Sequence, residues 1–174
     1  MVKRFSAPLL IRVVVGGAAG ALVACVDEVH NEEVAALGPE QAGVPPGPLH
    51  RPGQPCLTCH GGSGPAKLQL SVGGTVYETE GQTMPSVGSH VVIEDIDGNL
   101  WTTAPTNAAG NFFVLLSDFA PHYPTQPTVV PENGTVSITM ATHVSRDGSC
   151  ADCHSNPAGP SSAGPVYAHR VAAP

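Results

Sequence analysis

The chain has 174 residues, a length that suggests one domain or one small domain with appended segments. It contains 18 prolines and 20 glycines but only 5% aromatic residues, so much of it must be turn, loop and extended segment, and the protein alone is short of core. From Cys25 onward, four basic side chains stand against fourteen acidic ones, a formal charge of −10. Nucleic acid and anionic lipid are therefore poor partners, whereas a basic protein or a metal cation would be attracted.

Residues 1–24 have the pattern of a signal peptide. Lys3, Arg4 and Arg12 form a basic start, and an apolar run follows from Val13 to Val23. This run is too short to cross a bilayer as a permanent helix. The pattern predicts an exported protein.

The end of this run, Leu22-Val23-Ala24-Cys25, resembles the lipobox of bacterial lipoproteins, in which the cysteine is lipidated and becomes the new N-terminus. The resemblance implies that Cys25 carries a lipid anchor. Val26, rather than aspartate, follows this cysteine, which under the usual sorting rule implies the outer membrane, on its periplasmic face or at the cell surface. Ordinary signal cleavage beside an unrelated cysteine remains the alternative.

The segment 25–55 is first acidic and then rich in proline and glycine. Such a composition cannot bury enough apolar surface to order itself, and it predicts a semi-extended tether. The next segment, 56–66, carries the motif CLTCH followed by GGSGP, whose glycines free the backbone from helical constraint.

The motif CxxCH occurs twice, at Cys56, Cys59 and His60 and again at Cys150, Cys153 and His154. Two thiols three positions apart can add to the two vinyl groups of one haem, and the histidine that follows then becomes the proximal ligand of the iron. The sequence therefore predicts two covalently attached c-type haems. Because haem is a large apolar body, two of them would also supply core that the chain lacks.

Three other uses of paired cysteines are open. A zinc ribbon usually separates its pairs by about 15–20 residues, whereas about ninety residues intervene here. A thioredoxin-type redox pair needs a βαβ neighbourhood, which neither motif has. Disulfides are possible in an exported protein, although closing a two-residue loop gains little stability. A histidine directly after both pairs favours haem over all three.

Between the motifs, residues 67–148 predict a β domain. Short runs rich in Val, Ile, Thr and aromatic residues are separated by turn residues such as Asp97-Gly98, and several short strands at this spacing favour an antiparallel sandwich. No amphipathic helix of useful length is expected. The expected strands are Leu68–Tyr77, His90–Asp95, Asn99–Thr103, Asn111–Leu116, Thr128–Val130 and Thr135–Ala141.

Three patterns of this domain resemble the carboxypeptidase regulatory-like, transthyretin-like β-sandwich. They are an opening strand, Gly74 to Tyr77, a hydrophobic strand, Val91 to Ile93, that leads to Asp97-Gly98, and a TNAAGNF turn from Thr106 to Phe112. The resemblance covers roughly half of the chain and implies a noncatalytic scaffold. The whole arrangement is similar to small dihaem cytochromes of exported electron-transfer systems.

The segment 149–174 holds the second motif and a tail of small residues, with Val166-Tyr167 as its only bulky pair. The tail either lies across the second haem and excludes water or is disordered.

The sixth coordination position of each iron needs a further ligand, and the abundance of histidine suggests bis-histidine haems. His50 and His143 lie six and seven positions before the first cysteine of their motifs, and an extended segment of six residues reaches about 20 Å. We expect these two to be the distal ligands, although which iron each serves is open. The remaining candidates are His30, His90, His122, His169, Met84 and Met140, with His122 as the leading substitute.

These patterns predict electron transfer by an exported, lipid-anchored dihaem c-type cytochrome in the cell envelope or at the cell surface. Its expected partners are redox proteins, including other cytochromes or copies of itself, and a membrane through the lipid; nucleic acid is not expected. A haem peroxidase or small-oxide reductase is an alternative that needs an open sixth site and a polar pocket. A structural β-sandwich assembly subunit is the third class.

Overall fold

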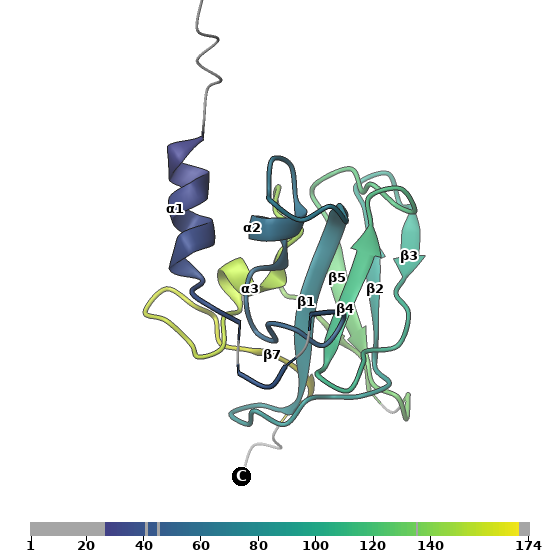
Figure 1. Cartoon of the computed structure of the whole chain (residues 1–174). Coiled ribbons are helices and arrows are strands. Elements are labelled where there is room, and N and C mark those ends of the chain that lie inside the picture. Colours follow the sequence, from purple (N-terminus) through teal and green to yellow (C-terminus); the bar gives the residue numbers. More distant parts are fainter. Residues whose placement is uncertain (1–26, 41, 45, 135, 171–174) are drawn as a thin grey trace, which may run out of the picture.

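The computed structural model of the chain (Figure 1) describes residues 27–170 except 41, 45 and 135. The predicted signal peptide and lipidation site at Cys25 lie outside the described residues. The helices are α1 (Glu28–Ala36), α2 (Cys56–His60) and α3 (Cys150–Cys153). The strands are β1 (Leu70–Thr79), β2 (His90–Glu94), β3 (Leu100–Thr102), β4 (Asn111–Leu115), β5 (Gln126–Val130), β6 (Ile138–Thr139) and β7 (Val166–His169).

The fold is a small β-sandwich, which confirms the predicted fold class. One sheet has the strand order β4-β1-β7 and the other β3-β2-β5-β6. All pairings are antiparallel except that of β1 with β7, which is parallel. In Figure 1 the helices α2 and α3 lie close to each other beside β1, with α1 beyond them.

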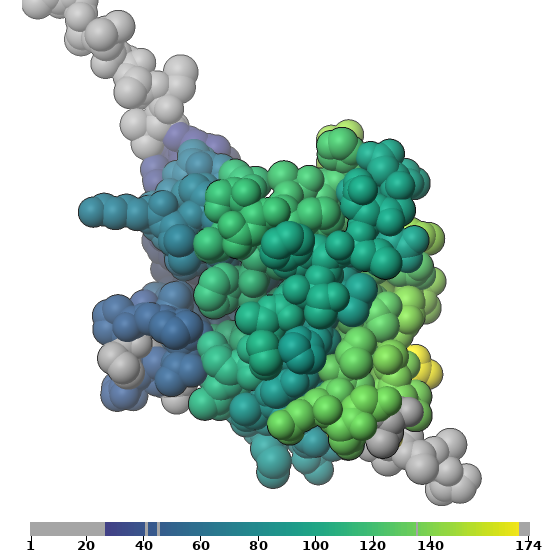
Figure 2. Space-filling model, turned by 90° about the vertical axis from the view of Figure 1, so that its right-hand side faces the viewer, coloured from purple at the N-terminus to yellow at the C-terminus, as the bar shows by residue number. Residues whose placement is uncertain are grey.

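The core lies between the two sheets because alternate residues of each strand point inward. From the first sheet come Val76 and Phe112, and from the second Val91 and Ile93, all nearly inaccessible to solvent. Burying a side chain of this size stabilises the fold by about 1.5–3 kcal/mol. Figure 2 views the molecule from the side of the four-stranded sheet, where residues from the middle of the chain form most of the visible surface.

Two predicted turns join strands as expected. In the turn between β2 and β3, Gly98 has φ +80° and its N–H donates to the carbonyl oxygen of Asp95 at 3.0 Å. In the turn before β4, Gly110 has φ +76° and donates in the same way to Asn107 at 2.8 Å. Glycine is the residue that adopts positive φ without steric cost.

Three features differ from the expectation. The tail forms a strand, β7, where we expected either a haem cover or disorder; it is stabilised by parallel pairing with β1, and Ala168 within it is fully buried. β6 is only two residues long, shorter than expected. The expected tether contains α1, which has no buried residue and so shows none of the apolar periodicity that would predict it.

The end of α1 is fastened to the segment before the first motif by Arg51. Its guanidinium donates to the carbonyl oxygens of Leu37 at 3.2 Å and Gly38 at 2.7 Å, and to the side chain of Gln54 at 2.8 Å. These contacts hold part of the expected tether against the domain.

Candidate functional site

Each CxxCH motif folds into a single helical turn. Pro55 precedes α2 in an extended conformation and Gly61 ends it, while α3 begins after Ser149. Residues three positions apart lie on the same face of a helix. The two thiols of each motif therefore project from one side of a short turn, as addition to two groups on one molecule requires.

The histidines that follow the cysteines are oriented in the same way. Nδ1 of His60 donates to the carbonyl oxygen of Leu68 at 2.9 Å, and Nδ1 of His154 donates to that of Gly164 at 2.8 Å. A proton on Nδ1 leaves the lone pair of Nε2 free for a metal. His90 makes the same kind of bond to the backbone at 2.9 Å, so the cysteines, and not this bond alone, distinguish the two motif histidines.

His50 lies beside the first motif. Its ring centroid is 5.7 Å from that of His60, with the ring planes 27° apart, and its Nδ1 donates to the carbonyl oxygen of Gly47. Two imidazoles that bind one metal ion from opposite sides, at about 2 Å per bond, have ring centres roughly 6 Å apart. The two rings are stacked in the structure, and only their centroid spacing is close to that of two axial ligands of one iron.

An amide network fixes the backbone around His50. The side-chain amide of Asn111 donates to the carbonyl oxygens of Pro48 at 3.1 Å and His50 at 3.0 Å. The Thr75 hydroxyl donates to the Asn111 amide oxygen at 2.7 Å, and Asn107 donates to Pro48 at 2.6 Å. Sequence reasoning treated the two asparagines only as part of a turn pattern and missed this role.

The second motif borders a cavity of about 430 Å³, within the usual range for small-molecule sites. Cys150, Cys153 and His154 line it, and so does His143. The structure therefore brings His143 to the second motif and His50 to the first. Part of the remaining lining is shared with the core between the sheets: Val72, Val91, Ile93, Phe112 and Val129.

A second hollow of about 570 Å³ has a different character. It is more open, and Leu49, Tyr77, Pro85 and Ala109 are among its lining residues, which include no cysteine or histidine. We therefore place the candidate chemistry at the two motifs rather than in this larger hollow.

The first thiol of each motif does not have the environment of a thiol-exchange site. Burial raises the pKa of Cys56 to about 11 and that of Cys150 to about 12, whereas exchange-active cysteines have lowered pKa values. The four paired cysteines are free in the structure. Among the described residues, no set of three potential ligand atoms that includes a cysteine lies within 4.8 Å, so these thiols do not converge on one ion.

Asp152, inside the second motif, lies beside Asp147. Partial desolvation by neighbouring protein, followed by a hydrogen bond with Asp147 and repulsion by its charge, raises the pKa of Asp152 to about 7, although one side of the residue stays open to solvent.

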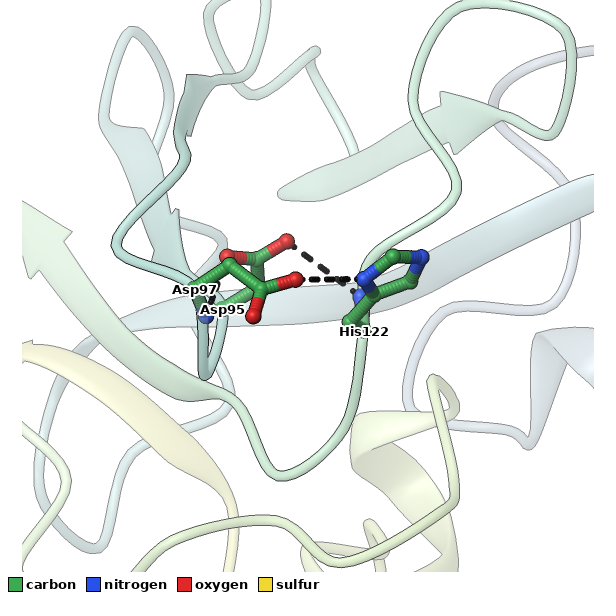
Figure 3. Close-up of side chains that lie close together, drawn as sticks. All are labelled: Asp95, Asp97 and His122. Carbon is green, nitrogen blue, oxygen red and sulfur yellow. Dashed lines mark hydrogen bonds and ion pairs between the residues drawn. The ribbon is translucent and has the colours of Figure 1, made fainter.

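His122, the leading substitute ligand, belongs to a turn cluster instead (Figure 3). Its Nδ1 lies 2.5 Å from the Asp97 carboxylate, and its backbone N–H donates to Asp95 at 3.3 Å. Asp95 also accepts from the backbone of Asp97 and from the backbone and side chain of Asn99, all at about 3 Å, and these bonds lower its pKa, that from the Asn99 side chain most. With its oxygens occupied in this way, Asp95 stabilises the turn.

The other candidate ligands are placed as follows. His169 pairs with Glu78 at 3.4 Å, and Met84 is 61% exposed in its loop. Met140 lines the cavity of the second motif, and Nε2 of His30 is buried with no hydrogen-bond partner.

Comparison with known proteins gives no family. No protein-family model, curated protein or solved structure matches the chain. The resemblance to regulatory-like sandwiches and dihaem cytochromes therefore remains a prediction from the motifs. Within residues 27–170, apart from the three positions left out, no helix is long and apolar enough to span a membrane.

Proposed function

We propose that the protein is a dihaem c-type cytochrome that transfers single electrons. The observation that carries the proposal is the shared geometry of the two motifs: two thiols on one helical turn, a histidine whose Nδ1 is bound to a carbonyl oxygen, and a second histidine nearby. Paired thiols without the histidine arrangement would fit many roles.

At the first motif, Cys56 and Cys59 would hold the porphyrin through thioether bonds, and His60 and His50 would be the axial ligands. At the second, Cys150 and Cys153 would hold it, with His154 and His143 as ligands. Haem iron supplies the one-electron redox chemistry, while the chain fixes ligands, burial and spacing.

The two sites would differ in their surroundings. The second borders a cavity that continues into the apolar core, whereas His60 is half-exposed on the other face of the first sheet. Because burial in a medium of low dielectric disfavours the extra positive charge of ferric iron, we expect the second haem to have the higher potential of the two. Bis-histidine ligation keeps both below the potentials of methionine-ligated haems.

The negative charge of the exported part favours a basic redox partner. Its expected location in the cell envelope or at the cell surface, with a lipid on Cys25, follows from the leader sequence alone.

The test is expression with the haem-attachment machinery, followed by a pyridine haemochrome assay and intact mass of the purified protein. We expect two haems per chain and, if Cys25 is lipidated, the mass of a lipid. A colourless product, with its paired thiols bridged or holding zinc, would contradict the proposal. Rapid binding of CO to the reduced wild-type protein, or turnover of peroxide, would favour a haem enzyme instead.

A further inference from the structure

Strand β1 contains two consecutive glycines, Gly73 and Gly74, in its buried middle. Glycine weakens a strand interior, and where it occurs there it often marks a close approach by another group. A Cβ on Gly73 would lie 3.0 Å from Cβ and 3.2 Å from Sγ of Cys56. A Cβ on Gly74 would lie 2.9 Å from Cβ and 3.2 Å from Sγ of Cys150. The first cysteine of each motif therefore rests on one of these glycines.

The two cysteines approach β1 from opposite faces. Consecutive residues of a strand point to opposite sides of the sheet. Gly74 faces the core, because a Cβ there would also lie 3.1 Å from the ring of Phe112, and Cys150 packs against the core cluster. Gly73 faces the other side, where Cys56 and α2 lie.

This arrangement limits the distance between the attachment sulfurs. Neighbouring Cα atoms are about 3.8 Å apart, so the path from one Sγ through the two glycines to the other Sγ cannot exceed roughly 13 Å. The electrostatic influence of Cys56 on Cys150, which contributes to the raised pKa of the latter thiol, agrees with such a short separation.

We propose that Gly73 and Gly74 hold the two haem attachment sites on opposite faces of a single strand, so that the haems form one electronically coupled pair. This inference rests on the proposed function. Thioether attachment through Cys56 and Cys150 would tie each porphyrin to one of these sulfurs, so little protein would separate two haems held there. Haem would supply the redox chemistry, and the charge of one oxidised iron would raise the potential of the other.

Single-haem variants test the coupling. Cys150→Ser with Cys153→Ser leaves the first haem, and Cys56→Ser with Cys59→Ser leaves the second. We expect the dihaem protein to show a paired positive and negative circular-dichroism band in the Soret region that neither variant shows. We also expect its redox titration to differ from the sum of the two variants, with the later-oxidised haem shifted to higher potential.

The possible failures are distinguishable. If the full chain binds two haems but its spectrum and titration equal the sum of the single-haem variants, the coupling is wrong and the proposed function stands. If the haemochrome assay finds no covalent haem, the proposed function itself fails.

The glycines are tested separately in the haem-loaded full chain. Gly73→Ala and Gly74→Ala should each lower haem content at the adjacent motif or shrink the paired Soret band. The matched control is Gly159→Ala, where a Cβ meets nothing within 4 Å and φ is not positive. Gly73→Ala and Gly74→Ala proteins with full haem content and an unchanged paired band would overturn the role of the glycines. The single-haem comparison stands even if one alanine variant does not fold.

Discussion

The imidazole rings of His50 and His60 lie 5.7 Å apart, brought together by the short loop that leads into α2. The first of these residues belongs to no motif, and the second ends a CxxCH motif. Their closeness supports the proposal that these two histidines would be the axial ligands of the first haem. Both rings donate a hydrogen bond from Nδ1 to a backbone carbonyl oxygen, which leaves the lone pair of each Nε2 free to bind a metal.

Replacing His50 with alanine should remove one axial ligand. We expect about half of the haem to lose its low-spin spectrum and to bind CO after reduction, because one of two irons gains an open site. Absorption and EPR spectra measure this. His122→Ala is the control, since that exposed side chain belongs to the Asp95 turn. An unchanged spectrum and potential would remove His50 from the ligand set.

Asn111→Ala should loosen the loop that carries His50. The substitution removes two amide bonds to the backbone of Pro48 and His50 and leaves the Thr75 hydroxyl without its acceptor. We expect a loss of about 1–3 kcal/mol in the free energy of unfolding and a partial high-spin signal from one haem. Asn107→Ala removes only one bond to the same loop, together with two bonds that Asn107 accepts within its turn, so it should lower stability but give a smaller high-spin signal. An equal high-spin signal from both variants would argue against the proposed positioning role of Asn111.

His143→Ala should open the second haem in the same way, because His143 lines the cavity that holds the second motif. Combined with His50→Ala, it should leave no six-coordinate low-spin haem. Met140→Leu is the comparison, since this methionine lines the same cavity. If Met140→Leu and not His143→Ala changes the potential of the second haem, methionine is the ligand.

The pKa of His122 should lie above that of an ordinary histidine. A hydrogen bond from its Nδ1 to Asp97, and the charge of that carboxylate, raise the pKa of His122 above its ordinary value of about 6.5. The pKa of His122 is higher in the folded state than in the unfolded state. The contact between His122 and Asp97 therefore contributes its full stability below the unfolded-state pKa, and this stability is lost as pH rises through the folded-state pKa. NMR titration measures the midpoint, and Asp97→Asn should lower it. A midpoint that does not respond to Asp97→Asn would show that the contact does not form in solution.

Ile93→Ala should destabilise the sandwich by about 2–5 kcal/mol, since the side chain is only 1% exposed and its loss enlarges a cavity. Denaturant unfolding of the haem-loaded protein gives the value. Val136→Ala removes a side chain that is 69% exposed, and a change within about 0.5 kcal/mol is expected. Similar losses for both variants would mean that the core is not where we place it.

The sandwich was predictable because the alternation of apolar and polar residues within each strand, and the turn residues at its ends, can be recognised from neighbouring positions in the sequence. β2 and β4 begin at the predicted residues and end one residue early, where alternating apolar residues stop at turns. β7 was not predictable, because four residues among small neighbours pair only with β1, and that partner lies about ninety residues away. The helix α1 could have been recognised from Asp27 as its N-cap and Gly38 after its last turn. We expected a tether there because the segment is acidic and rich in proline and glycine.

The candidate site was predictable only where chemistry fixes the spacing. The sequence singles out the four cysteines and two histidines of the motifs because thioether attachment would fix their spacing, whereas the contacts of Asn111 join residues about sixty positions apart. The glycine pair in β1 was a visible anomaly in a strand. Its partners, Cys56 and Cys150, became evident only when the chain was folded.

The parallel pairing of β7 with β1 has a consequence for biogenesis. The strand that completes the first sheet is synthesised after both CxxCH segments. Before it pairs with β1, Gly73 and Gly74 lie in a sheet that lacks this strand. If the chain takes up haem as we propose, attachment would be easiest before β7 docks, so delayed loading should yield folded protein without haem.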